Sequence, residues 1–279
     1  MSTGKYTCGS PHSTVKILVK TGYIRYNIGR KTKDVTAMKL MIVRHAEPDY
    51  SIDSLTPIGW EEARILADRL CKLDVKAFYC SPLGRAKDTA SFTLQALNRE
   101  AEILPWLKEF PPQILKPNLS ERDITWDWLP ADWTGNSAYY QMDQWANTPP
   151  MTEGNVAEHY NYVATELDKL LARHGYVREG NFYRTEYANE DTVILFCHFG
   201  LECVLLSHIL NIPPMLLWHG TCAAPTSVTI LNTEERQEGI AYFRMSTFGD
   251  TSHLYAAGKT PSFAARFCET YANFDPDRD

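Results

Sequence analysis

The stretch Met38-Lys39-Leu40-Met41-Ile42-Val43-Arg44-His45-Ala46-Glu47-Pro48 decides the fold predicted for this chain. Four consecutive apolar residues, Leu40 to Val43, are typical of a strand buried on both faces, as in a parallel sheet. Pro48 lacks the N–H that would extend the strand's hydrogen-bond ladder. Arg44 and His45 therefore stand at the carboxyl end of a core strand, where open α/β sheets bind their ligands.

Downstream of this strand the sequence predicts further helices and strands. Thr56 is a favourable N-cap and Pro57 suits the first helical position, so a helix is expected to begin there. Its buried stripe is predicted to be Ile58, Ala63, Leu66, Ala67 and Leu70. Further helices are predicted at 85–97, at 153–173 and from about 201. Further strands are predicted at 75–80, 103–104, 192–197, 227–231 and 240–245, with a hairpin over 177–184.

The window from about 111 to 150 breaks this pattern. Pro and Trp are dense in it, and neither the helical nor the strand period persists. We interpret it as an inserted, aromatic-rich cap that covers one end of the sheet, where it is well placed to select what binds. Residues 1–37 are expected to be a loosely ordered extension without a catalytic role. The main domain is therefore predicted to span residues 38–279.

Composition and charge narrow the classes of partner. The chain has 279 residues and a formal net charge of −6. That charge argues against a nucleic acid or a membrane as partner, because such binding draws its affinity mostly from Lys and Arg. No apolar run approaches the roughly 20 residues of a membrane helix, and no signal peptide is recognised. The seven cysteines are odd in number and lack C-x-x-C spacing, so we expect a cytoplasmic protein without disulfides.

A second strong strand ends in the same way as the first. Leu195-Phe196-Cys197-His198 is again an apolar run that stops at a histidine. If the two strands are parallel neighbours, His45 and His198 project into one crevice. Another strand is followed by the segment 81–89, in which Arg85 lies in the first turn of a helix, near its positive end.

These side chains favour an anion over a metal ion. Histidine is a frequent metal ligand, but no carboxylate stands at ligand spacing, and Arg44 beside His45 would repel a divalent cation. Arginine instead makes bidentate contacts to phosphate or carboxylate. Two arginines, two histidines and a helix terminus therefore predict a site for a phosphoryl group, with no metal and no cofactor.

Four motifs occur in a characteristic order. They are Arg44-His45-Ala46, Leu55-Thr56-Pro57-Ile58-Gly59, Ser81 with Arg85 and Thr89, and Cys197-His198-Phe199-Gly200. In order and spacing they resemble the motifs of the histidine phosphatase superfamily, also called the phosphoglycerate-mutase-like family. The resemblance covers about residues 38–255. With the predicted elements, it implies a three-layer α/β/α fold whose central sheet is mostly parallel, with helices on both faces and the inserted cap.

The resemblance implies a role for each matched residue. His45 would be the nucleophile that is phosphorylated on a ring nitrogen, and Glu109 would protonate the leaving group and later deprotonate water. With His198 they make up the implied catalytic set. The groups implied to hold phosphoryl oxygens are Arg44, Arg85, His198, Ser51 and the backbone N–H of Phe199. The rival carboxylates for the acid are Glu47, Asp49 and Asp53.

Two departures from the family pattern, Ala46 for Gly and Phe199 for a small residue, remove no catalytic side chain, so we expect an active enzyme. The expected activity is that of a histidine acid phosphatase-like phosphomonoesterase. It would hydrolyse a small phosphomonoester without a metal, through a phosphohistidine intermediate, and release inorganic phosphate. The alternatives are a phosphoglycerate-type phosphomutase and a non-catalytic phospholigand-binding protein. His253 is expected to be structural and Cys197 an inert thiol. The sequence predicts neither the natural substrate nor the oligomeric state.

Overall fold

A computed structural model of the chain describes residues 37–117 and 119–262. The predicted N-terminal extension lies outside these residues, except for Ala37, so its role stays a prediction. The strand predicted from the opening stretch is present as β1 (Lys39–Arg44). Residues 40–43 are buried throughout, as expected for a strand that is covered on both faces.

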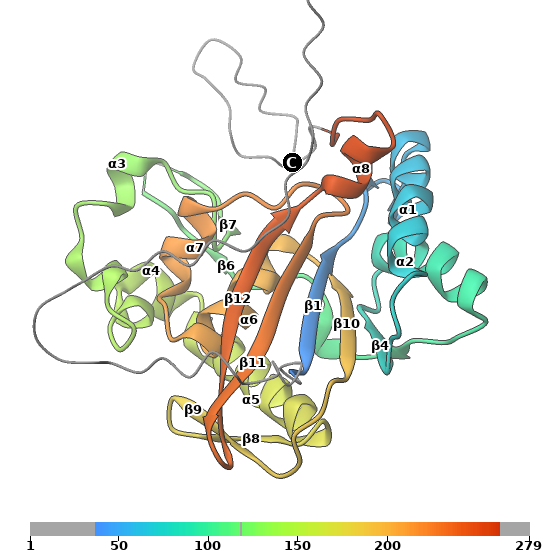
Figure 1. The fold of residues 1–279 in the computed structure, drawn as a ribbon. Coiled ribbons are helices and arrows are strands. Elements are labelled where there is room, and N and C mark those ends of the chain that lie inside the picture. Colours follow the sequence, from blue (N-terminus) through green and yellow to red (C-terminus); the bar gives the residue numbers. More distant parts are fainter. Residues whose placement is uncertain (1–36, 118, 263–279) are drawn as a thin grey trace, which may run out of the picture. The chain divides into compact units, whose positions relative to one another are not determined.

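An eight-stranded sheet lies at the centre of the described residues (Figure 1). Its strands follow the order β5 (Glu102–Ile103), β4 (Ala77–Cys80), β10 (Thr192–Cys197), β1, β11 (Val228–Gln237), β12 (Ile240–Asp250), β9 (Phe182–Thr185) and β8 (Tyr176–Glu179). From β5 to β1 neighbouring strands are parallel, whereas from β1 to β8 they are antiparallel. The prediction of a mostly parallel sheet therefore holds for one half of the sheet and is wrong for the other.

Short connections explain two of the antiparallel pairs, β11–β12 and β8–β9. The strands β11 and β12 are joined at Gly239, and β8 and β9 at Gly180. Both glycines have a positive φ, 78° and 60° respectively, as two-residue hairpin turns require. A connection this short joins only antiparallel strands, because a parallel pair needs a crossover of a dozen residues or more.

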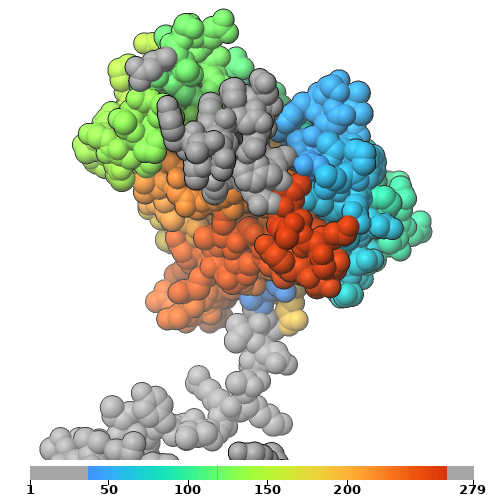
Figure 2. All heavy atoms as spheres, turned by 90° about the horizontal axis from the view of Figure 1, so that it is seen from above, coloured from blue at the N-terminus to red at the C-terminus, as the bar shows by residue number. Residues whose placement is uncertain are grey.

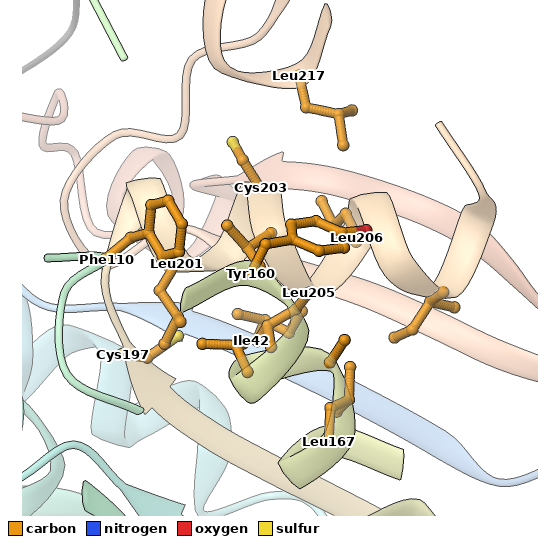
Figure 3. Close-up of a cluster of buried hydrophobic side chains, with 14 of the residues drawn as sticks. Ile42, Phe110, Tyr160, Leu167, Cys197, Leu201, Cys203, Leu205, Leu206 and Leu217 are labelled. Carbon is orange, nitrogen blue, oxygen red and sulfur yellow. The ribbon is translucent and has the colours of Figure 1, made fainter. Parts of the chain in front are cut away.

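Helices cover both faces of the sheet, so the three-layer prediction is confirmed. On one face lie α1 (Pro57–Leu70), α2 (Gly84–Leu97) and α8 (Ser252–Ala256), and on the other α5 (Val156–Arg173) and α6 (Phe199–Leu210). Alternate side chains of β1 pack against the helices on opposite faces of the sheet. Met41 and Val43 pack in the cluster that contains α1 and α2. Ile42 packs in the cluster with Leu167 of α5 and Leu205 of α6 (Figure 3).

At the start of α1 the predicted N-cap is confirmed, but the predicted set of buried residues is partly wrong. The Thr56 hydroxyl accepts the Gly59 N–H at 3.0 Å, as an N-cap should. Ile58 was expected in the stripe, but 55% of it is exposed. Gly59 faces inward instead, because a Cβ there would lie 2.2 Å from the Glu47 carbonyl oxygen. The close approach of two backbones sets the rotation of the helix.

The aromatic-rich window forms a cap of short elements. They are β6 (Gln113–Ile114), β7 (Asp123–Ile124), α3 (Pro130–Trp133), α4 (Pro149–Glu153) and two 3₁₀ turns, η2 (Ser137–Tyr140) and η3 (Trp145–Asn147). Three of its tryptophans surround or adjoin α7 (Pro214–Gly220), a helix that the sequence did not predict. Trp126, Trp128, Trp133 and Trp145 are all buried, so these rings act as packing between the cap and the domain.

Two remaining features bear on the site and its surroundings. A small hairpin of β2 (Pro48–Asp49) and β3 (Ser54–Leu55) follows β1, and the turn η1 (Pro105–Leu107) leads from β5 toward the cap. Within the described residues the cysteines are free. None of the helices in this part of the chain has the length and apolar character needed to cross a membrane.

Candidate active site

The carboxyl ends of two adjacent parallel strands bring the two predicted histidines together. Arg44 of β1 is in register with Cys197 of β10, so the residues that follow them, His45 and His198, leave the sheet side by side. Their ring centroids are 5.1 Å apart, and both side chains are buried. Viewed from above in Figure 2, this end of the molecule has the cap, in green, on one side and residues of α1, in blue, on the other.

His45 is held so that one ring nitrogen is directed away from the backbone. Its Nδ1 lies 2.7 Å from the carbonyl oxygen of Ala46, which can only accept, so we assign the ring proton to Nδ1. The lone pair is then on Nε2. Burial lowers the pKa of His45 well below its ordinary value, and the charges of Arg44 and Arg85 lower it further. The ring is therefore neutral near pH 7, as a nucleophile must be.

His198 is oriented by Ser81, which follows the neighbouring parallel strand β4. The Ser81 Oγ lies 2.8 Å from His198 Nε2 and accepts the Leu83 N–H at 3.2 Å. We therefore assign the hydroxyl hydrogen to His198 Nε2, which places the ring proton on Nδ1. Nδ1 has no hydrogen-bond partner among the described residues. It is a buried donor that is available to an oxyanion.

Burial also determines the protonation of His198. It lowers the pKa of this histidine well below the ordinary value, and the nearby His45, Arg85 and Arg44 act in the same direction. In the free protein His198 is thus neutral near pH 7, and its single ring proton is used as a hydrogen-bond donor. The tautomer set by Ser81 decides on which side of the ring that proton lies.

Two arginines supply positive charge to the same site. Arg44 is buried, donates to the Ala223 carbonyl and lies with its guanidinium 5.9 Å from the ring centre of Phe199. Arg85, in the first turn of α2, donates to Asp53 at 2.8 Å and lies 5.3 Å from the ring centre of Tyr50. Planar guanidinium groups of this kind suit bidentate contacts to a phosphoryl group.

The turn of the β2–β3 hairpin orients Arg85. Asp53 lies in the left-handed region at φ 47°, and its carboxylate accepts both the Gly84 N–H, at 2.7 Å, and the Arg85 guanidinium. These two partners hold the pKa of Asp53 below its usual range, although burial acts in the opposite direction. A Cβ on Gly84 would lie 1.9 Å from the Asp53 carbonyl oxygen, so only glycine permits this approach.

Glu109 lies at the start of α6, immediately beyond His198. Its Oε1 accepts the Leu201 N–H at 2.9 Å and the Phe110 N–H at 2.8 Å, and its Oε2 accepts the Gly200 N–H at 3.4 Å. Burial raises the pKa of Glu109, opposed by these N–H groups and by the two arginines. A carboxyl group with a raised pKa, with one oxygen held only by a long hydrogen bond, has the properties of a general acid.

The other carboxylates are engaged elsewhere. Asp53 pairs with Arg85, Glu47 accepts from the Thr56 hydroxyl, and Asp49 accepts from Ser51 in an exposed turn. Ser51 is thereby held in that turn, and the contacts do not bring it onto the histidines or arginines. Its proposed phosphate contact stays a prediction. Phe199 opens α6, with its ring beside Arg44.

The cap meets the site at the same helix terminus. A Cβ on Gly200 would lie 2.6 Å from the Trp126 ring, so the indole packs directly on the backbone two residues after His198. The Trp218 Nε1–H donates to the Gly200 carbonyl at 3.0 Å. The sequence placed Gly200 in a motif and the tryptophans in a cap, but it did not pair them.

A loop next to His45 carries a residue that the sequence did not single out. Thr226 has a φ of 58°, which is unusual for a β-branched residue, and its N–H donates to the His45 carbonyl at 3.2 Å. His253 lies 3.1 Å from the Thr226 hydroxyl and 3.3 Å from Arg69. His253 therefore supports the loop, consistent with the structural role expected of it.

The sequence of this chain matches a known protein family. Residues 40–245 match the model of the histidine phosphatase superfamily, branch 1. The chain belongs to this superfamily. Among curated proteins, a probable phosphatase of Schizosaccharomyces pombe is 24% identical over 236 residues, covering 78% of this chain and 95% of the relative.

Two solved phosphatase structures share the fold. A mycobacterial glucosyl-3-phosphoglycerate phosphatase superimposes with a TM-score of 0.53 at 19% identity, covering 77% of this chain and all of the other. Phosphoserine phosphatase from Entamoeba histolytica, solved with phosphoserine, superimposes with a TM-score of 0.51 at 20% identity, covering 78% of this chain and 99% of the other. At these identities the likeness concerns the fold.

Proposed function

We propose that this histidine phosphatase is a metal-independent phosphomonoester hydrolase that acts through a phosphohistidine intermediate on His45. One observation carries the proposal. The Nδ1–H of His45 is engaged by its own chain at Ala46, so the free lone pair of a buried, neutral imidazole is on Nε2, and the charges of two arginines act on this ring. Such a ring nitrogen is a nucleophile, and the surrounding charges suit a phosphoryl group.

In the first step, Nε2 of His45 attacks phosphorus and the bond from phosphorus to the leaving oxygen breaks. The arginines and the Nδ1–H of His198 hold the phosphoryl oxygens, whose charge they neutralise. Glu109 gives its proton to the departing alkoxide. The raised pKa of Glu109 supports this role, because it favours the protonated form that a general acid needs.

In the second step, water attacks the phosphohistidine and the bond from phosphorus to nitrogen breaks. Glu109, now ionised, takes a proton from the water as the new bond forms. Inorganic phosphate leaves and His45 is restored. No step calls on a metal ion, because the arginines supply the charge that a divalent cation provides in other phosphoryl-transfer enzymes.

We also propose that the substrate is a small phosphorylated molecule. The phosphoserine and glucosyl-3-phosphoglycerate phosphatases named above act on such compounds, as their names state. The cap lies directly on α6 through Trp126, so its loops are the part of the chain best placed to select the leaving group. A panel of small phosphomonoesters, with phosphate release as readout, identifies the class that the cap accepts.

The decisive variant is His45→Ala, with His159→Ala on α5 as its matched control. Phosphate release is measured on the panel with chelator present, and the phosphoenzyme is trapped by acid quenching with labelled substrate. We expect the His45 variant to lose both turnover and label, and the control to keep both. Turnover and label that survive in the His45 variant would refute the mechanism. Transfer to a second hydroxyl of phosphoglycerate without phosphate release would indicate a mutase instead.

A further inference from the structure

One buried acid close to the site has no part in the mechanism above. Glu202 is the only charged residue in the otherwise mostly apolar helix α6, and 1% of it is exposed. It lies one turn beyond His198, whose carbonyl accepts the Glu202 N–H at 2.8 Å. A carboxyl group buried in a helix of this character is costly unless a nearby charge compensates it, so its surroundings are informative.

Arg44 is the cation that acts on this carboxyl group. Its charge and the Thr229 hydroxyl of β11 favour the ionised form of Glu202. The Thr229 hydroxyl lies near enough to have this effect, but neither carboxylate oxygen completes a hydrogen bond of normal geometry with any described residue. The carboxyl group is therefore only partly compensated.

Three other titratable groups face Glu202. Glu109, from the loop before the cap, opposes its ionisation. The thiols of Cys197 of β10 and Cys203 of α6 have pKa values raised by burial and by Glu202, so they stay neutral near pH 7. Burial is the largest influence and raises the pKa of Glu202 to about 7. Near neutral pH this carboxyl group is thus divided between its two protonation states, and a small change in local charge shifts the balance.

The two arginines of the site differ in the carboxyl groups that their charges act on. Arg85 pairs with Asp53, whose side chain is 45% exposed and whose lowered pKa keeps it ionised. The charge of Arg44 favours ionised Glu202, which is sealed from solvent and whose oxygens complete no ion pair or hydrogen bond with the described residues. When an anion binds near the two arginines, water still screens its charge from that of Asp53. At Glu202 the same anion brings a second negative charge into a region of low dielectric.

We propose that Glu202 takes up one proton from solvent when a phosphoryl dianion binds beside Arg44. While the site is empty, the charge of the buried guanidinium favours ionised Glu202. When the dianion binds, its negative charge opposes that of ionised Glu202, and the carboxyl group becomes neutral. The inference rests on the phosphate site of the proposed function.

The proton uptake makes anion affinity depend on pH in one direction. Below pH 7 Glu202 is already protonated, so binding takes up no proton and affinity is constant. Above pH 7 each bound dianion must be accompanied by a proton, so affinity falls with rising pH. With a free-state pKa of about 7 and a much higher one in the complex, linkage gives about a tenfold loss between pH 6 and pH 8.

Sulfate is the probe, because it is a dianion across this range and is not hydrolysed. Its affinity is measured by calorimetry from pH 6 to pH 8.5, at constant ionic strength and in buffers of two different ionisation enthalpies, which gives the number of protons taken up. For the wild type we expect about half a proton per sulfate at pH 7. Glu202→Gln should take up none and bind with affinity constant within about twofold, whereas Glu158→Gln, exposed on α5, should match the wild type.

Each outcome decides a different question. Failure of the wild type to bind sulfate would refute the phosphate site, and with it the proposed function. Binding of sulfate with the same pH dependence in Glu202→Gln would refute this inference alone. Proton uptake that is lost in Glu109→Gln and kept in Glu202→Gln would assign the proton to the other acid.

A second variant covers the case in which Glu202→Gln fails to fold. Thr229→Val removes the hydroxyl that favours ionised Glu202. The pH at which sulfate affinity begins to fall should then move upward, because the carboxyl group keeps its proton to higher pH. An unchanged midpoint in Thr229→Val would refute the inference.

Discussion

Ser81→Ala tests how the structure prepares His198. The hydroxyl of Ser81 lies 2.8 Å from His198 Nε2, and both residues are fully buried. Without it, Nε2 has no partner and nothing selects the tautomer that carries its proton on Nδ1. A neutral imidazole with the proton on the wrong side presents a lone pair to the phosphoryl oxygen, which repels it.

The magnitude follows from the burial of the lost partner. A buried polar group left without its hydrogen bond costs about 1–3 kcal/mol. If that cost falls on the transition state, kcat/KM should fall by about fivefold to 150-fold. Ser91→Ala is the control, since the Ser91 hydroxyl donates to the Asp88 carbonyl within α2. It should change kcat/KM by less than about twofold.

The assay is hydrolysis of p-nitrophenyl phosphate, measured from pH 5 to pH 8, with the ratio of wild type to Ser81→Ala as the readout. The pKa of His198 is well below its ordinary value, so at pH 7 the ring is neutral and the tautomer matters most. As the pH falls toward that pKa, an imidazolium forms that has an N–H on both nitrogens. The ratio should therefore shrink with falling pH. Equal kcat/KM for the two proteins at pH 7, or a ratio that grows as the pH falls, would refute the reasoning.

Two further variants test the acid and the turn that orients Arg85. Glu109→Gln should slow substrates with poor leaving groups by about 10²–10⁴-fold and p-nitrophenyl phosphate much less, because that leaving group needs little protonation; equal losses for both would point to another acid. Gly84→Ala places a Cβ 1.9 Å from the Asp53 carbonyl oxygen and should lower both the melting temperature and kcat/KM, at a cost of about 1–3 kcal/mol. Gly135→Ala, where a Cβ meets nothing within 4 Å, is its control, and equal effects of the two alanines would contradict the steric argument.

Much of the fold was predicted from local pattern. The buried strand before His45, the N-cap at Thr56 and the hairpin turn at Gly180 were all confirmed. Each depends on residues close together in the chain, namely an apolar run, a capping hydroxyl and a glycine that tolerates a positive φ. The pairing of His45 with His198 was also anticipated, because parallel neighbouring strands end at the same edge of a sheet.

Other features depend on contacts between distant segments and could not be predicted in this way. Whether Ile58 faces the core was decided by the Glu47 backbone, which meets Gly59 and sets the rotation of α1. The Trp126 ring packs on Gly200, which is more than seventy residues away in the chain. Beyond β1, the pairs β11–β12 and β8–β9 are antiparallel because each is a hairpin, whereas the antiparallel pairing of β1 with β11 joins segments far apart in the chain; strand composition alone reveals neither.

The sequence by itself determined which chemical groups gather at the strand ends: two histidines and two arginines, recognisable by motif and spacing. Only the tertiary structure decided how these groups are protonated. The family resemblance singled out Glu109 as the acid, whereas nothing in the sequence distinguished Glu202. The fold places both near the start of α6, Glu109 on the helix N–H groups and Glu202 buried one turn beyond His198. A pKa is set by burial and by neighbouring charge, and both are products of contacts between segments far apart in the chain.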